Sequence, residues 1–122
     1  MTKRRLDQGR KAEEETVFRL VASGYEILAR NYRCPVGEVD VVAKDGDTVV
    51  FVEVRSLLGG DYGDPLSTVT KRKQRRVAKA ALHYLTCHDL LDRPARFDVA
   101  AVKVSPEGFD IELVKDAFDS PL

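Results

Sequence analysis

Two valine-rich segments, separated by an Asp-Gly pair, limit what this chain can fold into. Residues 37–43 read GEVDVVA and residues 49–55 read VVFVEVR, with Asp45-Gly46 between them. An Asp-Gly pair between two apolar runs is the strongest short-range signal of a β-hairpin. A charged side chain inside such a strand is costly unless a metal, a partner or a substrate neutralises it. The pattern therefore predicts a hairpin whose charges serve a function.

A two-residue turn at Asp45-Gly46 predicts how the two strands pair. Val42 would lie opposite Val49, and Asp40 would lie opposite Phe51. A slip by one residue would turn Asp40 toward the valine face, so the hydrophobic pattern opposes such a slip.

Alternation along the strands places the charged side chains of the hairpin on one face. These residues are Glu38, Asp40, Glu53 and Arg55. The valines of the opposite face are expected to pack in the core: Val39, Val41, Val50, Val52 and Val54. Asp40 and Glu53 would be diagonal neighbours, about 7–8 Å apart. Because neighbouring carboxylates raise one another's pKa, a divalent cation with oxygen ligands would relieve their repulsion.

The remaining periodicity predicts a single α/β domain over residues 1–122. Helices are expected at 7–23 and 67–86, the second capped by Ser67 or Thr68, and further strands at 25–33, 96–104 and 109–115. The expected order is helix, three strands, helix, two strands. A Gly- and Asp-rich stretch over residues 56–66 is expected to be a mobile loop beside the acidic strand. Its Tyr62 is an ordinary loop residue or one that stacks on a base.

Two polar residues are expected on inward helix faces. Glu13 lies four, seven and eight positions before the apolar residues of its helix: Val17, Leu20 and Val21. Glu14 matches almost as well, so periodicity alone leaves both open. In the second helix the expected core stripe is Val77, Ala78, Ala81, Leu82 and Leu85, and Gln74 points toward it. On the residues alone, Gln74 would simply hydrogen-bond the backbone.

Charge is distributed unevenly although the net charge is zero. No acidic residue occurs between Pro65 and His88, where six cations gather: Lys71, Arg72, Lys73, Arg75, Arg76 and Lys79. A solvated helix face would explain this stretch, but the lack of balancing acids favours contact with a phosphate backbone.

The remaining composition points to the cytoplasm. Cys34 and Cys87 are few and far apart, as expected for free thiols in a reducing compartment rather than for a disulfide or a zinc site. No apolar run approaches the roughly 20 residues that span a bilayer. The basic start is followed by no apolar signal core, so export is not expected.

Several segments together resemble a known family. They are GRKAEE (9–14), GYEILARNYR (24–33), GEVD (37–40), FVEVR (51–55), the stretch from KQ (73–74) to ALHYL (81–85), RFDV (96–99) and DAF (116–118). With this order of elements, the chain resembles the PD-(D/E)XK nuclease superfamily. Within it, the chain is most similar to the YraN-like family of predicted endonucleases, which are akin to archaeal Holliday junction resolvases. The resemblance covers nearly the whole chain.

The resemblance implies a restriction-endonuclease-like fold, a mixed central sheet flanked by helices, and a metal-dependent nuclease site. It implies Glu13, rather than Glu14, with Asp40 and Glu53 as ligands of Mg²⁺ or Mn²⁺, and the Val54 carbonyl as a fourth. The implied catalytic residues are Asp40, Glu53, Arg55 and Gln74. Glu38 is expected to support the ligands rather than bind the metal. DNA, including branched or structured DNA, is the implied substrate, and related resolvases imply a homodimer.

One departure from the family pattern concerns activity, since Arg55 stands where the family has lysine. Arginine keeps its charge and grips phosphate through two donors, but it does not lose a proton at working pH. The alternative function is therefore a catalytically weak or inactive nuclease-fold module that binds nucleic acid or a protein partner. A purely structural explanation would pair Asp40 and Glu53 with Arg55, or with Arg30 and Arg33. Asp98, in a valine-rich strand, is expected to be a buried structural partner.

Overall fold

The computed structural model describes residues 3–57 and 65–122, with side chains described for residues 9–57 and 66–122. Most of the expected loop, including Tyr62, lies outside these residues. The flanks of that loop are regular: the preceding strand continues through Ser56 to Leu57, and a short 3₁₀ helix starts at Pro65.

The elements follow the predicted order. They are α1 (Lys3–Ala22), β1 (Glu26–Cys34), β2 (Gly37–Asp45), β3 (Thr48–Leu57), the 3₁₀ helix η1 (Pro65–Thr68), α2 (Lys71–Cys87), β4 (Ala95–Ser105) and β5 (Gly108–Phe118). The strands form one mixed sheet in the order β1-β2-β3-β4-β5, in which only β3 and β4 run parallel. The predicted mixed α/β fold is confirmed. No helix within 3–57 or 65–122 is long and apolar enough to cross a membrane.

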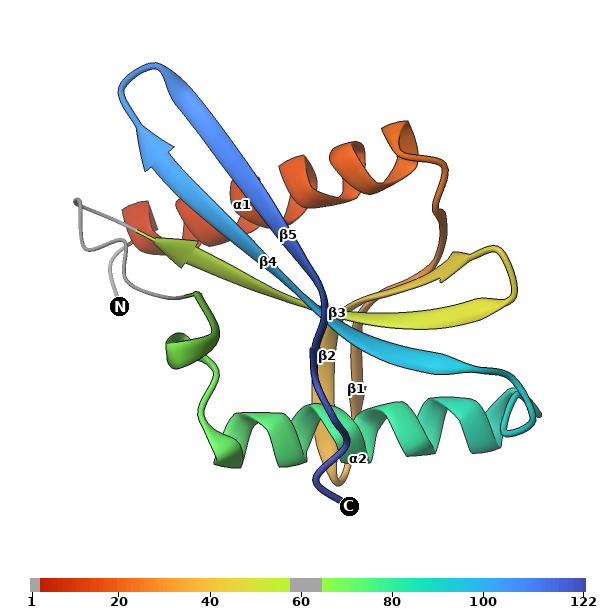
Figure 1. Cartoon of the computed structure of the whole chain (residues 1–122). Helices are drawn as coiled ribbons and strands as arrows, with labels where there is room; N and C mark the ends of the chain where they lie inside the picture. The colour runs from red at the N-terminus through yellow and green to blue at the C-terminus, as the bar shows by residue number, and fades with distance from the viewer. Residues whose placement is uncertain (1–2, 58–64) are drawn as a thin grey trace.

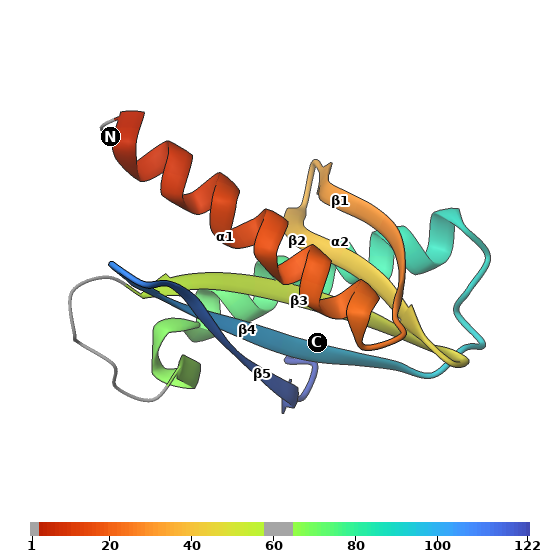
Figure 2. The ribbon, with the colours of Figure 1, turned by 90° about the horizontal axis from the view of Figure 1, so that it is seen from above.

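The two long helices cover opposite faces of the sheet. Figure 1 shows α1 on one side of the strands and α2 on the other, and Figure 2 shows α1 crossing over the sheet from above. Each helix lies over its own apolar cluster. Phe51 and Val42 pack with α2, whereas Val41 and Val52 pack with Leu20 of α1. The sheet is therefore buried on both faces, which explains its continuous runs of valine.

The hairpin forms, but its register differs by two residues from the prediction. Asp45 pairs with Thr48 and Val42 pairs with Phe51, so Gly46 and Asp47 make the turn. Gly46 has φ +61°, as a type II′ turn requires at its first central position. Because the shift is even, the side chains of β3 keep their predicted faces.

The corrected register brings the two central carboxylates closer than predicted. The paired residues of the β2–β3 ladder end at Val41 and Val52. The same register, continued by one step, sets Asp40 directly opposite Glu53 rather than diagonal to it. In place of a ladder bond, the Val54 amide donates to Asp40 Oδ2 at 2.8 Å. The strands thus separate at the acidic residues.

Val39 was predicted on the face of Val41 but packs on the opposite side, in the cluster beneath α2. The reason lies in the neighbouring strand, where Asn31 adopts a left-handed conformation with φ +53°. Asn31 and Asp40 fall between consecutive pairs of the β1–β2 ladder. Alternation is interrupted at that point, so Asp40 sits at an irregularity of the sheet.

Helix α2 begins later than predicted. Thr70, not Ser67 or Thr68, is the N-cap, and its Oγ1 accepts a hydrogen bond from the Lys73 amide at 3.2 Å. The residues that α2 buries are Val77, Ala78, Ala80, Ala81 and Tyr84. Leu82 was predicted in the core but is 49% exposed. In α1 the buried stripe is Ala12, Thr16 and Leu20, while Val21, predicted inward, is exposed.

Asp98 is a buried structural partner, as predicted. It is fully buried, and its Oδ1 accepts from Arg96 Nε and from the Asp116 amide, each at 3.0 Å. Cys34 and Cys87 are free thiols.

Candidate active site

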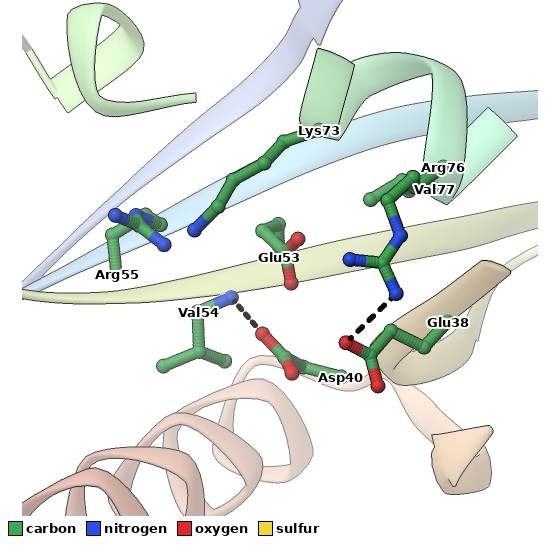
Figure 3. Close-up of a pocket in the computed structure, with 8 residues that line it drawn as sticks. All are labelled: Glu38, Asp40, Glu53, Val54, Arg55, Lys73, Arg76 and Val77. Atoms are coloured by element: carbon green, nitrogen blue, oxygen red, sulfur yellow. Dashed lines mark hydrogen bonds and ion pairs between the residues drawn. The ribbon is translucent and has the colours of Figure 1, made fainter. Parts of the chain in front are cut away.

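The acidic face of the hairpin opens into a cavity of about 200 Å³ between β2, β3 and the start of α2. The residues that line it are Glu38, Asp40, Glu53, Val54, Arg55, Lys73, Arg76 and Val77 (Figure 3). The structure therefore brings together all four charged residues predicted for one face of the hairpin. It adds two cations from α2.

Asp40 is held in place by the backbone of the neighbouring strand. One of its carboxylate oxygens accepts a hydrogen bond from the Val54 N–H, in place of a backbone carbonyl of β2. Within the described chain, no ion pair includes Asp40 or Glu53. Arg30 and Arg33, considered as structural partners, instead pair with Glu13 and Glu38. Salt bridges therefore do not explain the two central carboxylates.

Burial raises the pKa of Glu53 from its ordinary value of 4.5 to about 9, and a hydrogen bond with Asp40 and the charge of Asp40 add to the shift. Lys73 and Arg55 oppose it through their positive charge. The two carboxyl groups are thus close enough to share a proton. A hard divalent cation, which prefers carboxylate oxygens, satisfies the same pair, so the donor set fits Mg²⁺ or Mn²⁺.

Glu13 lies on the other side of Asp40. Its Oε1 accepts from Asn31 Nδ2 at 2.8 Å and from Arg30 Nη2 at 3.4 Å. It lines a second cavity of about 650 Å³ against α1, and this cavity shares Asp40 and Val54 with the first. Among the described residues, no group of three or more His, Cys, Asp or Glu is placed to hold a metal. Asp40 and Glu53 thus line the smaller cavity together, whereas Glu13 lines only the larger one.

Of the two glutamates left open by periodicity, the structure favours Glu13 as the inward one. The Glu13 side chain is 13% exposed, whereas Glu14 is an exposed residue.

Glu38 stands at the rim of the smaller cavity. It forms ion pairs with Arg33 at 3.5 Å and with Arg76 at 3.6 Å, and its side chain is half exposed. These contacts match a residue that holds neighbouring cations in place.

Gln74 does not line the cavity within the described chain. Its Nε2 donates to the Val69 carbonyl at 3.1 Å, which is the backbone role that remained open. Its Oε1 is buried and makes no hydrogen bond with the described residues.

Comparison with known proteins places the chain in a family. Residues 12–102 match the uncharacterised protein family UPF0102. The chain belongs to the UPF0102 family. This is the YraN family, so the predicted relationship is confirmed. A UPF0102 protein of Syntrophus aciditrophicus is 48% identical over 114 residues, which cover 93% of this chain and 90% of that protein. One of Geobacter metallireducens is 46% identical over 111 residues, which cover 91% of each.

Among solved structures, Pyrococcus furiosus SfsA in complex with Ca²⁺ is similar to this chain at 16% identity and a TM-score of 0.40. The match covers 88% of this UPF0102 chain and spans 62% of the length of the solved one.

Sequence reasoning missed that Lys73 and Arg76 of this UPF0102 chain belong to the acidic cavity. It placed them only in the basic stretch of α2. The spacing of residues in α2 could have predicted the position of Lys73. It lies one turn before Val77, which is buried and also lines the cavity. Arg76 is itself exposed, as are the four cations of the stretch that do not line the cavity: Lys71, Arg72, Arg75 and Lys79.

Proposed function

We propose that this UPF0102 chain is a metal-dependent nuclease that hydrolyses phosphodiester bonds in DNA. The observation that supports this most is the pairing of Asp40 with Glu53 inside a cavity that three cations also line. A divalent cation would neutralise the repulsion between two adjacent carboxylates. The surrounding cations call for an anion. A metal-bound phosphodiester meets both requirements.

Asp40 and Glu53 would hold the metal. The family resemblance implies Glu13 as a further ligand, which would have to reach the metal from the other side of Asp40. Mg²⁺ or Mn²⁺ bound there would lower the pKa of a water molecule and neutralise charge on the scissile phosphate. The Val54 amide orients Asp40 for this task. Arg55 can grip phosphate oxygens through two donors of its guanidinium group.

The charge at the start of α2 supports the binding of further phosphates there. The N-terminus of a helix carries partial positive charge, so cations in its first turn are unfavourable by about 0.3–1 kcal/mol each unless an anion is near. Helix α2 has no acidic residue in its first turn but begins Lys71-Arg72-Lys73. A DNA backbone bound along this turn would remove that penalty.

Cleavage of a DNA panel tests the proposal. Single-stranded, duplex and branched oligonucleotides are incubated with Mg²⁺ or Mn²⁺ and with wild type, Asp40→Asn or Asp110→Asn. Asp110 is an exposed aspartate of β5 and serves as the matched control. We expect Asp40→Asn to abolish cleavage and Asp110→Asn to retain it. Equal activity of Asp40→Asn and wild type would sink the assignment.

A second candidate function is DNA binding without cleavage, and one feature favours it. Arg55 occupies the motif position at which the related nucleases carry lysine. This candidate predicts that wild type cuts no member of the panel yet binds it with an affinity that falls steeply with salt. Affinity that does not change with salt would instead favour a protein partner. The homodimer implied by the resemblance is testable by sedimentation.

A further inference from the structure

Lys73 differs from the other cations of α2 in its position. It is partly buried, whereas Lys71 and Arg72 before it are exposed, and it lines the acidic cavity. In Figure 3 its side chain reaches from α2 across the cavity, and the ammonium group lies between Arg55 and Glu53.

Close packing of α2 against β2 explains this position. A Cβ atom at Gly37 would lie 2.0 Å from the carbonyl oxygen of Arg76, so only glycine allows the helix to approach so near. The Thr70 cap holds the Lys73 amide, and Val77, one turn later, is buried in the apolar cluster. The first turn of α2 is thereby fixed above the strand that carries Asp40.

Arg55 is turned partly away from the same carboxylates. Its Nε donates to Thr68 Oγ1 of η1 at 3.3 Å. Both Lys73 and Arg55 lower the pKa of Glu53, and the effect of Lys73 is the larger. The ammonium of Lys73 is thus the more strongly coupled of the two cations to the acidic pair.

We propose that Lys73 supplies from α2 the catalytic ammonium group that this chain lacks at position 55, and that it contacts the scissile phosphate. The inference rests on the proposed nuclease function. In this arrangement Arg55 binds phosphate from the side of η1, while Lys73 donates to an oxygen on which charge develops during hydrolysis. A donor aimed at developing charge in a partly buried site lowers the barrier more than it strengthens binding.

Kinetics of matched lysine variants test this role. Lys73→Gln should lower kcat by about 100-fold, which is the loss seen when one such hydrogen-bond donor is removed, and should change KM little. Lys71→Gln removes the same charge from the same helical turn outside the cavity, so it should raise KM and reduce salt dependence while kcat changes little. Lys73→Arg keeps the charge and serves as a second variant should Lys73→Gln fold poorly.

Rescue provides a sharper test. The site needs one ammonium group, which either position can supply. The kcat of the double variant Lys73→Gln/Arg55→Lys should therefore be at least about tenfold higher than the kcat of Lys73→Gln. A purely structural role of Lys73 predicts no recovery.

Metal binding gives a readout without turnover. Removing a positive charge beside Asp40 and Glu53 favours a divalent cation over a proton, because the cation carries twice the charge. Mn²⁺ affinity of the DNA-free protein, measured by calorimetry, should therefore rise several-fold in Lys73→Gln and less in Lys71→Gln.

The outcomes separate this inference from the proposed function. A wild type that cleaves DNA, with Lys73→Gln retaining its kcat, refutes the inference alone. Equal Mn²⁺ affinities of the two glutamine variants also refute it, because they would place the ammonium away from the carboxylates. A wild type that cleaves nothing refutes the nuclease function and the catalytic role together, even if Lys73→Gln binds Mn²⁺ more tightly.

Discussion

Replacing Glu53 with glutamine should change how stability depends on pH. The pKa of Glu53 is about 9 in the folded chain and 4.5 in its ordinary state, because the residue is partly buried beside Asp40. Between these values the folded state binds a proton that the unfolded state has released. Stability must therefore fall as pH rises through this window, in contrast to the common case of a carboxyl group with a lowered pKa.

The magnitude follows from the size of the window. Each pH unit inside it costs up to about 1.4 kcal/mol of folding free energy. Between pH 6 and pH 8 wild type should therefore lose up to about 3 kcal/mol, a large part of the ~5–15 kcal/mol that stabilises a typical domain. Glutamine resembles the protonated carboxyl group and does not titrate, so Glu53→Gln should lack this loss.

Urea unfolding with EDTA at pH 6, 7 and 8 measures the effect. The useful quantity is the difference between wild type and Glu53→Gln at each pH, because contributions of the histidines cancel in it. Glu112→Gln, at an exposed position of β5, is the control and should follow wild type. If the curves of wild type and Glu53→Gln run parallel from pH 6 to pH 8, the account of Glu53 as a partly buried, proton-sharing carboxyl group is wrong.

Three further predictions concern metal and packing. Mn²⁺ should raise the melting temperature of wild type more at pH 8 than at pH 6, because it displaces a proton, and Asp40→Asn and Glu53→Gln should each lose this response in thermal melts. Asp98→Ala should destabilise the chain by about 3 kcal/mol in urea unfolding, since it removes a fully buried carboxylate that pairs with Arg96 and leaves the Asp116 amide without its acceptor. Gly37→Ala should cost about 1–3 kcal/mol because its Cβ would overlap a carbonyl oxygen, whereas Gly9→Ala, which meets nothing within 4 Å, should be neutral or stabilising.

Much of the fold was predictable because the valine runs and helical stripes are strong periodic signals. The order of elements and the faces of Glu53 and Arg55 follow from alternation alone. The register of the hairpin does not follow from alternation. Turns at Asp45-Gly46 and at Gly46-Asp47 give the same alternation of side chains and differ only in which residues of β2 and β3 pair.

The other errors arise from single residues whose effect is not periodic. The left-handed conformation of Asn31 interrupts alternation and moves Val39 to the other face, which no hydrophobic pattern reveals. The start of α2 was misplaced because Ser67, Thr68 and Thr70 are all good N-caps, and the 3₁₀ turn takes the first two.

In the candidate site, Asp40 and Glu53 were identifiable because charge inside a valine-rich strand is conspicuous. Lys73 was hidden among five other cations of α2, and only the packing of α2 against Gly37 places Lys73 and Arg76 in the cavity. The position of Glu13 depends on its contacts with Asn31 and Arg30, which lie 18 and 17 residues away and leave no local signal.

The charge balance of the cavity links metal binding to DNA binding. Three carboxylates and three cations line it among the described residues, so a protonated Glu53 leaves the cavity with one net positive charge. A divalent cation that displaces the proton raises this to two, and a phosphodiester group returns it to one. DNA without metal would instead leave the cavity neutral with a carboxyl proton trapped beside phosphate. Metal and phosphate should therefore each strengthen binding of the other.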